Sequence, residues 1–320
     1  MFHNLFGLLA VMAMAPAPTP FISPVQMYGQ SVPVQPVLAV QNRYLPAAGE
    51  VKKTFVAPPV KKNNKNIGPK TTGKSVFVAD VASGGVLFGQ AQHDVLPIAS
   101  LTKLMTALVV LESEAGLEGD LTFSNFDFDR QSKNVFLAGD VISKKDAMRA
   151  LLIGSVNSSA SALAGSTGLS RQEFVERMNQ KAKELNLPSL YFVEPTGLDP
   201  GNKGSAADVA ALITIVLRRE EIRDILDDPS ADIKTADGRQ YIIKSTNLLL
   251  PTYLNKTPYK ITGAKTGSLP EAGFCMAQVT RNADGNEVVA VLLGSDNHFS
   301  RYNDIKALTG WAFESFTWSK

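Results

Sequence analysis

The spacing of apolar and polar residues predicts strands near both ends of the folded part of the chain. Short runs rich in β-forming residues and bounded by turn residues are typical of strands. Five segments have this pattern: Ser75–Asp80, Val86–Gln90, Tyr259–Thr266, Gly273–Thr280 and Glu287–Ser295. Ala82–Gly85 predicts a hairpin between the first two segments, and the Asp-Gly pair at Asp284–Gly285 predicts a tight turn between the last two.

Between these two regions the apolar residues recur mostly with the period of a helix. A helix is predicted to begin near Ser100, and the clearest others are Lys144–Leu152, Ser170–Leu185, Ala206–Leu226 and, near the end of the chain, Arg301–Phe316. This order predicts a mixed α/β (α+β) fold. An antiparallel sheet completed by both ends of the chain would be flanked by helices, with an all-helical subdomain inserted at about residues 113–230.

The N-terminal part has a different composition. Its apolar stretch Leu5–Ala15 is shorter than the roughly 20 residues that cross a bilayer. Residues 1–17 are therefore predicted to be a signal peptide or a hydrophobic N-terminal segment, and the protein is expected outside the cytoplasm, in the periplasm or at the cell surface. Residues 18–73 are proline- and lysine-rich and predict a disordered linker, which leaves residues 74–320 as the globular domain.

Charge is distributed unevenly along the chain. Residues 1–74 contain seven lysines and one arginine against one acidic residue, a net of +7, while the rest contains 24 basic and 29 acidic residues, a net of −5. A mildly acidic domain on a basic tail argues against nucleic-acid binding, which needs a basic face on the fold itself. The tail is predicted to be a solvated linker, with contact to an anionic wall polymer or membrane surface as the alternative.

Residue types that hold metals and cofactors are sparse. Cys275 is the single cysteine, so no intrachain disulfide can form, and it lies in a predicted core strand, where we expect a buried, inert thiol. His3, His93 and His298 lack metal-ligand spacing, and no glycine-rich phosphate loop is present. We therefore expect no metal and no cofactor, which leaves nucleophilic catalysis or plain binding.

Lys103 follows Ser100 by one turn in an apolar segment, A-S-L-T-K-L-M-T-A-L-V-V-L-E. Residues i and i+3 of a helix share a face, so the amine can reach the hydroxyl. A buried amine is costly unless it is used, and burial near other cations would lower the pKa of Lys103 toward that of a general base. The pair predicts a nucleophile and its base, although S-x-x-K alone is also consistent with a helix-capping serine and a solvent-reaching lysine.

Two later stretches support the catalytic interpretation. In L-L-I-G-S-V-N-S-S, small polar residues interrupt an apolar run, so that Ser155 could relay a proton and Asn157 could hold a substrate carbonyl. In Y-K-I-T-G-A-K-T-G, Lys265 and Thr266 stand at the end of a strand-like run, and Gly267 would let a substrate backbone approach closely. Taken singly, each stretch is also consistent with a capping turn or a strand end.

S-x-x-K, S-x-N and K-T-G in this order resemble the motif set of β-lactamases and penicillin-binding proteins. Over about residues 70–318 the chain resembles the serine-type D-alanyl-D-alanine peptidases of the low-molecular-mass penicillin-binding protein family. The phrase F-V-E-P-T-G-L-D-P, the A-G-F after K-T-G and the stretch G-S-D-N-H-F-S-R-Y also match. The resemblance implies a β-lactamase/transpeptidase-like fold and a hydrolase that acts on peptidoglycan stem peptides.

By this resemblance, Ser100 would attack the carbonyl of the penultimate D-Ala, and Lys103 would accept its proton. The backbone N–H groups of Ser100 and Ser268 would form the oxyanion hole, in which one donor contributes roughly 3–4 kcal/mol. Ser155 and Lys265 would pass a proton to the departing amine. Water would then hydrolyse the acyl-enzyme, and β-lactams should acylate the same serine.

The resemblance also implies a binding role for other residues. Asn157 would anchor the acyl side chain, while Thr266 and Lys265 would hold the free carboxylate of the released residue. Arg301 falls where the family tends to place a carboxylate-binding arginine. The S-V-N motif departs from the common S-G-N followed by Asp, because Val156 would add bulk beside the cleft and Ser158 would remove a charge.

Other noticeable residues are predicted to be structural. Glu194 is expected to be a loop acid and His298 a surface residue, while Trp311 and Trp318 should pack the last helix. Removal of terminal D-Ala is the favoured activity, because the chain ends soon after that helix. D,D-endopeptidase cleavage of cross-links, a β-lactamase and a non-catalytic module that binds the wall or senses β-lactams remain alternatives.

Overall fold

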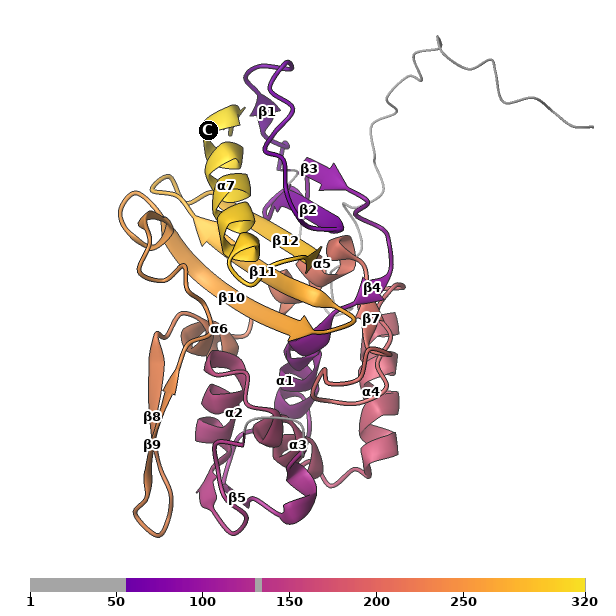
Figure 1. Cartoon of the computed structure of the whole chain (residues 1–320), viewed down its shortest axis with the longest axis vertical. Helices are drawn as coiled ribbons and strands as arrows, with labels where there is room; N and C mark the ends of the chain where they lie inside the picture. The colour runs from indigo at the N-terminus through magenta and orange to yellow at the C-terminus, as the bar shows by residue number, and fades with distance from the viewer. Residues whose placement is uncertain (1–55, 130–133, 320) are drawn as a thin grey trace, which may run out of the picture. The chain divides into compact units, whose positions relative to one another are not determined.

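A computed structural model of the chain describes residues 56–129 and 134–319 (Figure 1). Its central element is an antiparallel five-stranded sheet with the order β10-β11-β12-β2-β3. These strands are β2 (Ser75–Asp80), β3 (Val86–Gln90), β10 (Lys260–Leu269), β11 (Gly273–Arg281) and β12 (Glu287–Ser295). Because β12 pairs with β2, strands from both ends of the domain meet in one sheet, which confirms the predicted antiparallel α/β (α+β) architecture.

Helices and short strand pairs account for most of the remaining described chain. The helices are η1 (Ala99–Thr102), α1 (Lys103–Leu111), η2 (Asn125–Asp127), α2 (Lys144–Ile153), α3 (Asn157–Gly165), α4 (Arg171–Glu184), α5 (Ala206–Val216), α6 (Glu220–Leu226), η3 (Tyr253–Asn255) and α7 (Ser300–Ser315). The strand pairs are β1 (Val60–Lys61) with β13 (Phe316–Thr317), β4 (Leu96–Pro97) with β7 (Lys203–Gly204), β5 (Asp120–Thr122) with β6 (Val141–Ser143), and β8 (Ser230–Lys234) with β9 (Gln240–Lys244).

Both faces of the sheet are buried, because helices cover each of them. Successive side chains of a strand point to opposite faces, so Val76 and Val78 of β2 pack toward α7, while Phe77 and Ala79 join the larger core formed by the other helices. Figure 1 shows α7 on one face of the sheet and α5 on the other, in agreement with their contacts to β12. Trp311 and Trp318 pack against the α7 side, as predicted.

Three helices begin at a serine whose hydroxyl accepts a hydrogen bond from a backbone N–H group of the first turn. These N-caps are Ser143 before α2, Ser170 before α4 and Ser205 before α5. In α4 the carboxylate of Glu173 also accepts from the backbone N–H of Ser170, which completes a capping box. An N-cap of this kind typically contributes about 1 kcal/mol to stability, and here the caps mark where these three helices start.

The end of the predicted linker differs from its prediction. Within residues 56–73, β1 pairs antiparallel with β13, and the Trp311 indole N–H donates to the Asn66 side chain at 2.8 Å. The folded domain therefore begins before residue 74, because proline-rich composition does not show that a segment pairs with a distant strand. The predicted segment 1–17 and the linker up to residue 55 lie outside the described residues.

The predicted helix Ala206–Leu226 is two helices, α5 and α6. The chain turns between them, where Arg219 is extended and its guanidinium pairs with Glu112 of the neighbouring segment at 2.6 Å. Two acidic residues then occupy the first turn of α6, where they favour a helix start. The insert also contains β5, β6 and β7, and the β8–β9 hairpin that follows α6 was not predicted, so the insert is not entirely helical.

Candidate active site

Ser100 lies in η1, the short helix that leads directly into α1. Ala99 before it has a φ of +48°, in the left-handed region that non-glycine residues rarely adopt. Backbone strain of this kind is stored at functional sites, at a cost of about 1–3 kcal/mol per residue. The Ser100 hydroxyl accepts a hydrogen bond from Lys103 Nζ at 2.9 Å, so the predicted pair is formed and the capping interpretation does not hold.

Lys103 is fully buried, and three oxygen atoms surround its amine. Besides the Ser100 hydroxyl, Nζ contacts Asn157 Oδ1 at 2.7 Å and the backbone carbonyl of Thr196. Burial lowers the pKa of Lys103 from 10.5 to about 7, although the negative charge of Glu194 acts in the opposite direction. An amine with this pKa can accept a proton near neutral pH.

The loop that contacts Lys103 is organised around the buried carboxylate of Glu194. This carboxylate accepts hydrogen bonds from the backbone N–H groups of Thr196 at 2.6 Å and Gly197 at 2.5 Å, and from the Asn202 amide at 2.7 Å. Because its oxygens are occupied in this way, Glu194 is the structural acid that we predicted. Its additional influence on the pKa of Lys103 was not predicted, because that influence depends on the folding of a loop far along the chain.

Gly197 fits this loop against the nucleophile. It has a φ of +82°, and a Cβ atom there would lie 2.2 Å from the carbonyl oxygen of Ala99 and 2.8 Å from the backbone nitrogen of Ser100. No other residue type could occupy the position without displacing the strained turn. The phrase F-V-E-P-T-G-L-D-P contained this signal, although its physical reason is visible only in the folded chain.

Ser155 and Lys265 form a second serine–lysine pair. Lys265 on β10 donates to the Ser155 hydroxyl at 2.7 Å and to the carbonyl of Thr266 at 3.0 Å. Ser155 has a φ of +58° in the turn between α2 and α3. Burial lowers the pKa of Lys265 well below 10.5, and the positive charges of Lys103 and Arg301 lower it further.

Gly267 lies where β10 meets the nucleophile turn. A Cβ atom there would lie 2.9 Å from the backbone nitrogen of Ser100 and 3.0 Å from the carbonyl oxygen of Ile98. The glycine therefore lets β10 pack against the nucleophile turn. It also lines the hollow described below, and its predicted role of admitting a substrate backbone stays a prediction. Thr266 and Ser268 flank it on β10, and the Thr266 hydroxyl donates to that of Thr246 at 2.8 Å.

Arg301, at the beginning of α7, is buried beside this strand. It donates from Nη1 to the carbonyl of Gly267 at 2.9 Å and from Nη2 to the Tyr302 hydroxyl at 2.9 Å. Tyr302 in turn donates to the backbone carbonyl of Thr246 at 2.8 Å. The arginine is thus held at the same end of β10 as Thr266.

A single hollow connects these residues. It is lined by Ser100, Ser155, Thr246, Leu248, Thr266, Gly267, Ser268, His298, Arg301 and Tyr302. Six of the predicted site residues therefore line one hollow. Lys103, Asn157 and Lys265 join it through their hydrogen bonds to Ser100, to each other or to Ser155. Thr246 and Leu248 were missed, because no motif marks them in the sequence, and Tyr302 was not singled out although it ends the matching stretch G-S-D-N-H-F-S-R-Y.

Comparison with known proteins places this site in a family. The family model described as D-alanyl-D-alanine carboxypeptidase matches residues 61–297, about three quarters of the chain. The chain belongs to the D-alanyl-D-alanine carboxypeptidase family. The match contains the serines and lysines of both pairs described above and ends just before His298.

Some relatives within the family are named carboxypeptidases and others endopeptidases. The chain is 27% identical over 250 residues to the D-alanyl-D-alanine carboxypeptidase DacF of Bacillus subtilis, covering 76% of this chain and 62% of DacF. It is 30% identical over 221 residues to the D-alanyl-D-alanine endopeptidase of Haemophilus influenzae, covering 68% of this chain and 74% of that protein. The chain thus spans less than two thirds of DacF and about three quarters of the endopeptidase.

Solved structures agree with the fold. The Streptomyces K15 DD-transpeptidase superposes with a TM-score of 0.71 at 23% identity, over 77% of this chain and 99% of that one. Penicillin-binding protein D2 from Listeria monocytogenes, in its cefotaxime-bound form, superposes with a TM-score of 0.67 at 27% identity, over 77% and 98% of the two chains. The predicted β-lactamase/transpeptidase-like fold is therefore confirmed.

Two departures from the common motif of the family have a structural explanation. Val156 is only 5% exposed and belongs to the main core, so it does not add bulk beside the cleft as predicted. Ser158 is 2% exposed, and a carboxylate at this depth would be costly without a partner. Both residues are therefore packed around α3, and neither lines the hollow that contains Ser100.

Cys275 lies on β11 and is completely buried. Burial raises the pKa of its thiol to about 11. A thiol with this pKa stays protonated and is a poor nucleophile near neutral pH, in agreement with the predicted inert role. It takes no part in the chemistry of the family site.

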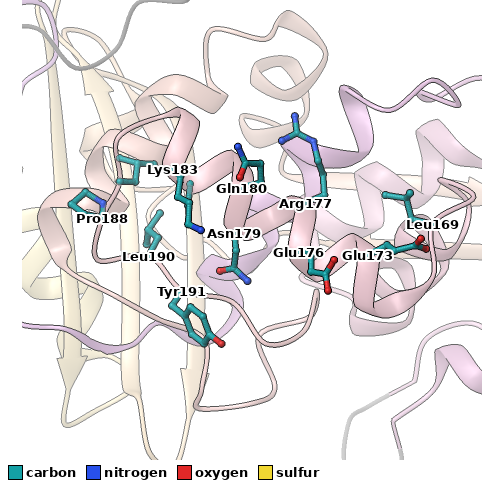
Figure 2. Close-up of a pocket in the computed structure, with 12 residues that line it drawn as sticks. Leu169, Glu173, Glu176, Arg177, Asn179, Gln180, Lys183, Pro188, Leu190 and Tyr191 are labelled. Atoms are coloured by element: carbon teal, nitrogen blue, oxygen red, sulfur yellow. The ribbon is translucent and has the colours of Figure 1, made fainter.

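A second hollow lies along α4 (Figure 2) and contains none of the predicted family motif residues. Its Glu173 belongs to the capping box of α4. Asn179 holds the segment that leads to the catalytic loop, since its side chain donates to the carbonyl of Phe192 at 2.8 Å and accepts from the N–H of the same residue at 2.9 Å. Glu173 and Asn179 therefore have structural roles in this hollow, and Asn179 positions the segment that leads to the Glu194 loop.

Residues 56–129 and 134–319 contain no group of three or more His, Cys, Asp or Glu side chains that could hold a metal ion. Within the same ranges, no helix combines the length and the apolar character that crossing a bilayer requires.

Proposed function

We propose that this chain is a serine-type D-alanyl-D-alanine carboxypeptidase, which removes the terminal D-Ala of peptidoglycan stem peptides through an acyl-enzyme on Ser100. The observation that carries the proposal is the hydrogen-bonded set of Ser100, Lys103 and Asn157, next to the Ser155–Lys265 pair, in one hollow. Nucleophile, base and proton relay are then within hydrogen-bonding reach without any rearrangement.

In the acylation step, the Ser100 hydroxyl attacks the carbonyl carbon of the penultimate D-Ala while its proton passes to the neutral amine of Lys103. Negative charge develops on the carbonyl oxygen, and the backbone N–H groups of Ser100 and Ser268 stabilise it. The peptide C–N bond then breaks as the departing amine takes up the proton that Lys103 accepted, relayed through Ser155, which Lys265 holds at 2.7 Å, so that Lys103 is neutral again. D-Ala leaves, and its acyl partner stays bound to Ser100 as an ester.

Hydrolysis of this ester releases the shortened peptide. Water attacks the ester carbonyl, and its proton passes to the neutral amine of Lys103. The same amine returns a proton to the Ser100 oxygen as the C–O bond breaks. Glu194 is a poor base for this water, because its oxygens accept five backbone or side-chain hydrogen bonds within its own loop. This arrangement favours a slow-deacylating, penicillin-binding peptidase over a β-lactamase.

The carboxylate of the departing D-Ala would bind at the Arg301 end of the hollow. Arg301 and the Thr266 hydroxyl supply a cation and a hydrogen-bonding group beside β10. Asn157 would hold the acyl part of the substrate, since Lys103 Nζ contacts both its side chain and the Ser100 hydroxyl. Recognition of a free carboxylate favours trimming of a terminal residue.

Endopeptidase cleavage of cross-links is the second candidate activity. The observation that favours it is the 30% identity to the endopeptidases of Haemophilus influenzae and Pseudomonas aeruginosa. The same Ser100 chemistry serves both reactions. The two differ only in whether the departing amine belongs to a free D-Ala or to a cross-linked stem.

The substrate class also implies where the protein acts. Peptidoglycan lies outside the cytoplasm, so we infer an extracytoplasmic location in the periplasm or at the cell surface, in agreement with the signal-like residues 1–17. β-Lactams would acylate Ser100, as the cefotaxime-bound form of the Listeria relative suggests. The basic segment before residue 74 would meet an anionic wall polymer or membrane surface.

Mass spectrometry of two substrates tests this proposal. The full chain would be incubated with a stem pentapeptide that ends in D-Ala-D-Ala and, separately, with a cross-linked dimer. We expect the wild type and a Ser166→Ala control outside the hollow to shorten the pentapeptide by one D-Ala, and Ser100→Ala to leave it intact. Cleavage of the dimer alone would favour the endopeptidase, and no turnover of either substrate would refute the peptidase.

A further inference from the structure

The hollow around Ser100 contains a titratable side chain for which no role has been given. His298 lies in the loop between β12 and α7 and lines this hollow together with Ser100 and Arg301. We propose that His298 is a specificity-determining residue, which adds a positive charge that favours substrates with a free terminal carboxylate. The inference rests on the proposed function and deepens it, since it concerns which substrates Ser100 cleaves.

His298 and Arg301 share two aromatic neighbours. The centroid of the His298 ring lies 5.5 Å from that of Tyr302 and 5.8 Å from that of Phe274. The guanidinium of Arg301 lies 4.7 Å from the Tyr302 centroid and 5.4 Å from the Phe274 centroid. The same two rings therefore hold the imidazole and the guanidinium close together at one end of the hollow.

The charge of Arg301 has no protein counter-ion among the described residues. The side chain is 4% exposed, and no carboxylate of the described chain lies within 4 Å of its nitrogen atoms. Its two terminal nitrogens donate to neutral groups, and Nε has no partner. A buried cation without a counter-ion is costly, and an incoming carboxylate would offset that cost.

His298 is exposed and can exchange protons with solvent. Partial burial lowers its pKa below 6.5, and the positive charge of Arg301 lowers it further. Besides Arg301, the titratable group of α7 that faces the His298 ring is Tyr302. The neighbour from β11 is the uncharged Phe274, and β10 contributes the uncharged Thr266 and Ser268 to the same hollow. No acidic side chain from the described part of the chain lines the hollow, so the effect of Arg301 on the pKa of His298 is not cancelled there.

A bound carboxylate reverses this electrostatic balance. Placed beside Arg301, it attracts a second proton to the imidazole, and by linkage the protonated imidazole binds the carboxylate more tightly. The preference for a carboxylate should therefore rise as the pH falls through the pKa of His298. The peptide carboxylate itself has an ordinary pKa of about 3.3–3.7 and stays ionised above pH 5.

The test compares two substrates in the full-length protein. kcat/KM would be measured from pH 5 to pH 8 for a pentapeptide that ends in a free D-Ala carboxylate and for the same peptide ending in a carboxamide. Because the same free enzyme acts on both, the ratio cancels the titration of Lys103. We expect the ratio to rise about two- to fivefold toward pH 5, the range for an exposed ion pair.

Three variants complete the test. His298→Gln should give a ratio that does not change with pH, His298→Lys a ratio that is high at every pH, and His93→Gln, outside the hollow, the profile of the wild type. A ratio that is flat in the wild type, or that still rises in His298→Gln, would overturn the proposal. Wild-type protein that turns over neither peptide would instead refute the peptidase function, and the specificity proposal would fail with it.

Discussion

The two serine–lysine pairs of the site are built in opposite ways. Ser100 and Lys103 are three residues apart on one helical segment, whereas Ser155 and Lys265 are separated by 110 residues and come from the α2–α3 turn and from β10. Their hydrogen-bond lengths are nevertheless similar, at 2.9 and 2.7 Å. The first pair depends on helix geometry and the second on how the helical insert docks against the sheet.

Their electrostatic surroundings also differ. Both lysines are buried, but the nearby charges differ. The carboxylate of Glu194 raises the pKa of Lys103, whereas the positive charges of Lys103 and Arg301 lower the pKa of Lys265. Burial alone would lower the pKa of either amine. The Glu194 loop therefore keeps the pKa of Lys103 near 7, a value suited to a base, and this difference assigns the two lysines different roles.

The largest expected effect separates the two serines. Ser100→Ala should abolish covalent labelling by a fluorescent penicillin, because no nucleophile remains. Ser155→Ala should still be labelled, but roughly 10²–10⁴-fold more slowly, the usual contribution of a proton-transfer group. Labelling rates measured on gels or by stopped flow would check this, and equal labelling of Ser100→Ala and the wild type would disprove the assignment of the nucleophile.

A smaller effect is expected where the Glu194 loop meets the first pair. Gly197→Ala places a methyl group 2.2 Å from the carbonyl oxygen of Ala99, so it should slow labelling and reduce the free energy of unfolding. Gly168→Ala is the matched control, because Gly168 has a similar φ of +80° but no atom within 4 Å of its Cβ position.

The control carries only the left-handed strain, about 1–2 kcal/mol, or a few degrees in Tm for a domain of this size. Labelling by the Gly168 variant should match that of the wild type. Equal labelling by both variants would show that contact between Gly197 and the turn does not position Ser100.

Local patterns made the first pair and most strands predictable. The i, i+3 spacing placed Ser100 and Lys103 on one face, and runs of β-forming residues bounded by turns predicted β2, β3 and β12 with bounds that the structure repeats. The identity of the other site residues came from motif resemblance. Nothing in the local sequence places Ser155 next to Lys265.

The missed features all depend on contacts between distant segments. The break between α5 and α6 involves the pairing of Arg219 with Glu112, and β1 forms only because β13 lies opposite. The close approach of the Ser100 backbone to Gly267 was likewise not predicted. Sequence spacing indicates which residues have an unusual role, while the segment that packs against each residue determines what that role is.

The most direct test of the account is the pH dependence of Ser100 acylation, because the central claim is that Lys103 is a neutral base with a pKa of about 7. Only the neutral amine accepts a proton, so the acylation rate should fall as the pH drops below 7. The second-order rate constant for a fluorescent penicillin, measured from pH 5 to pH 9, should rise with pH and level off above about 7. A rate that is constant over this range, or that keeps rising steeply to pH 9 as for an amine with an ordinary pKa, would contradict the account.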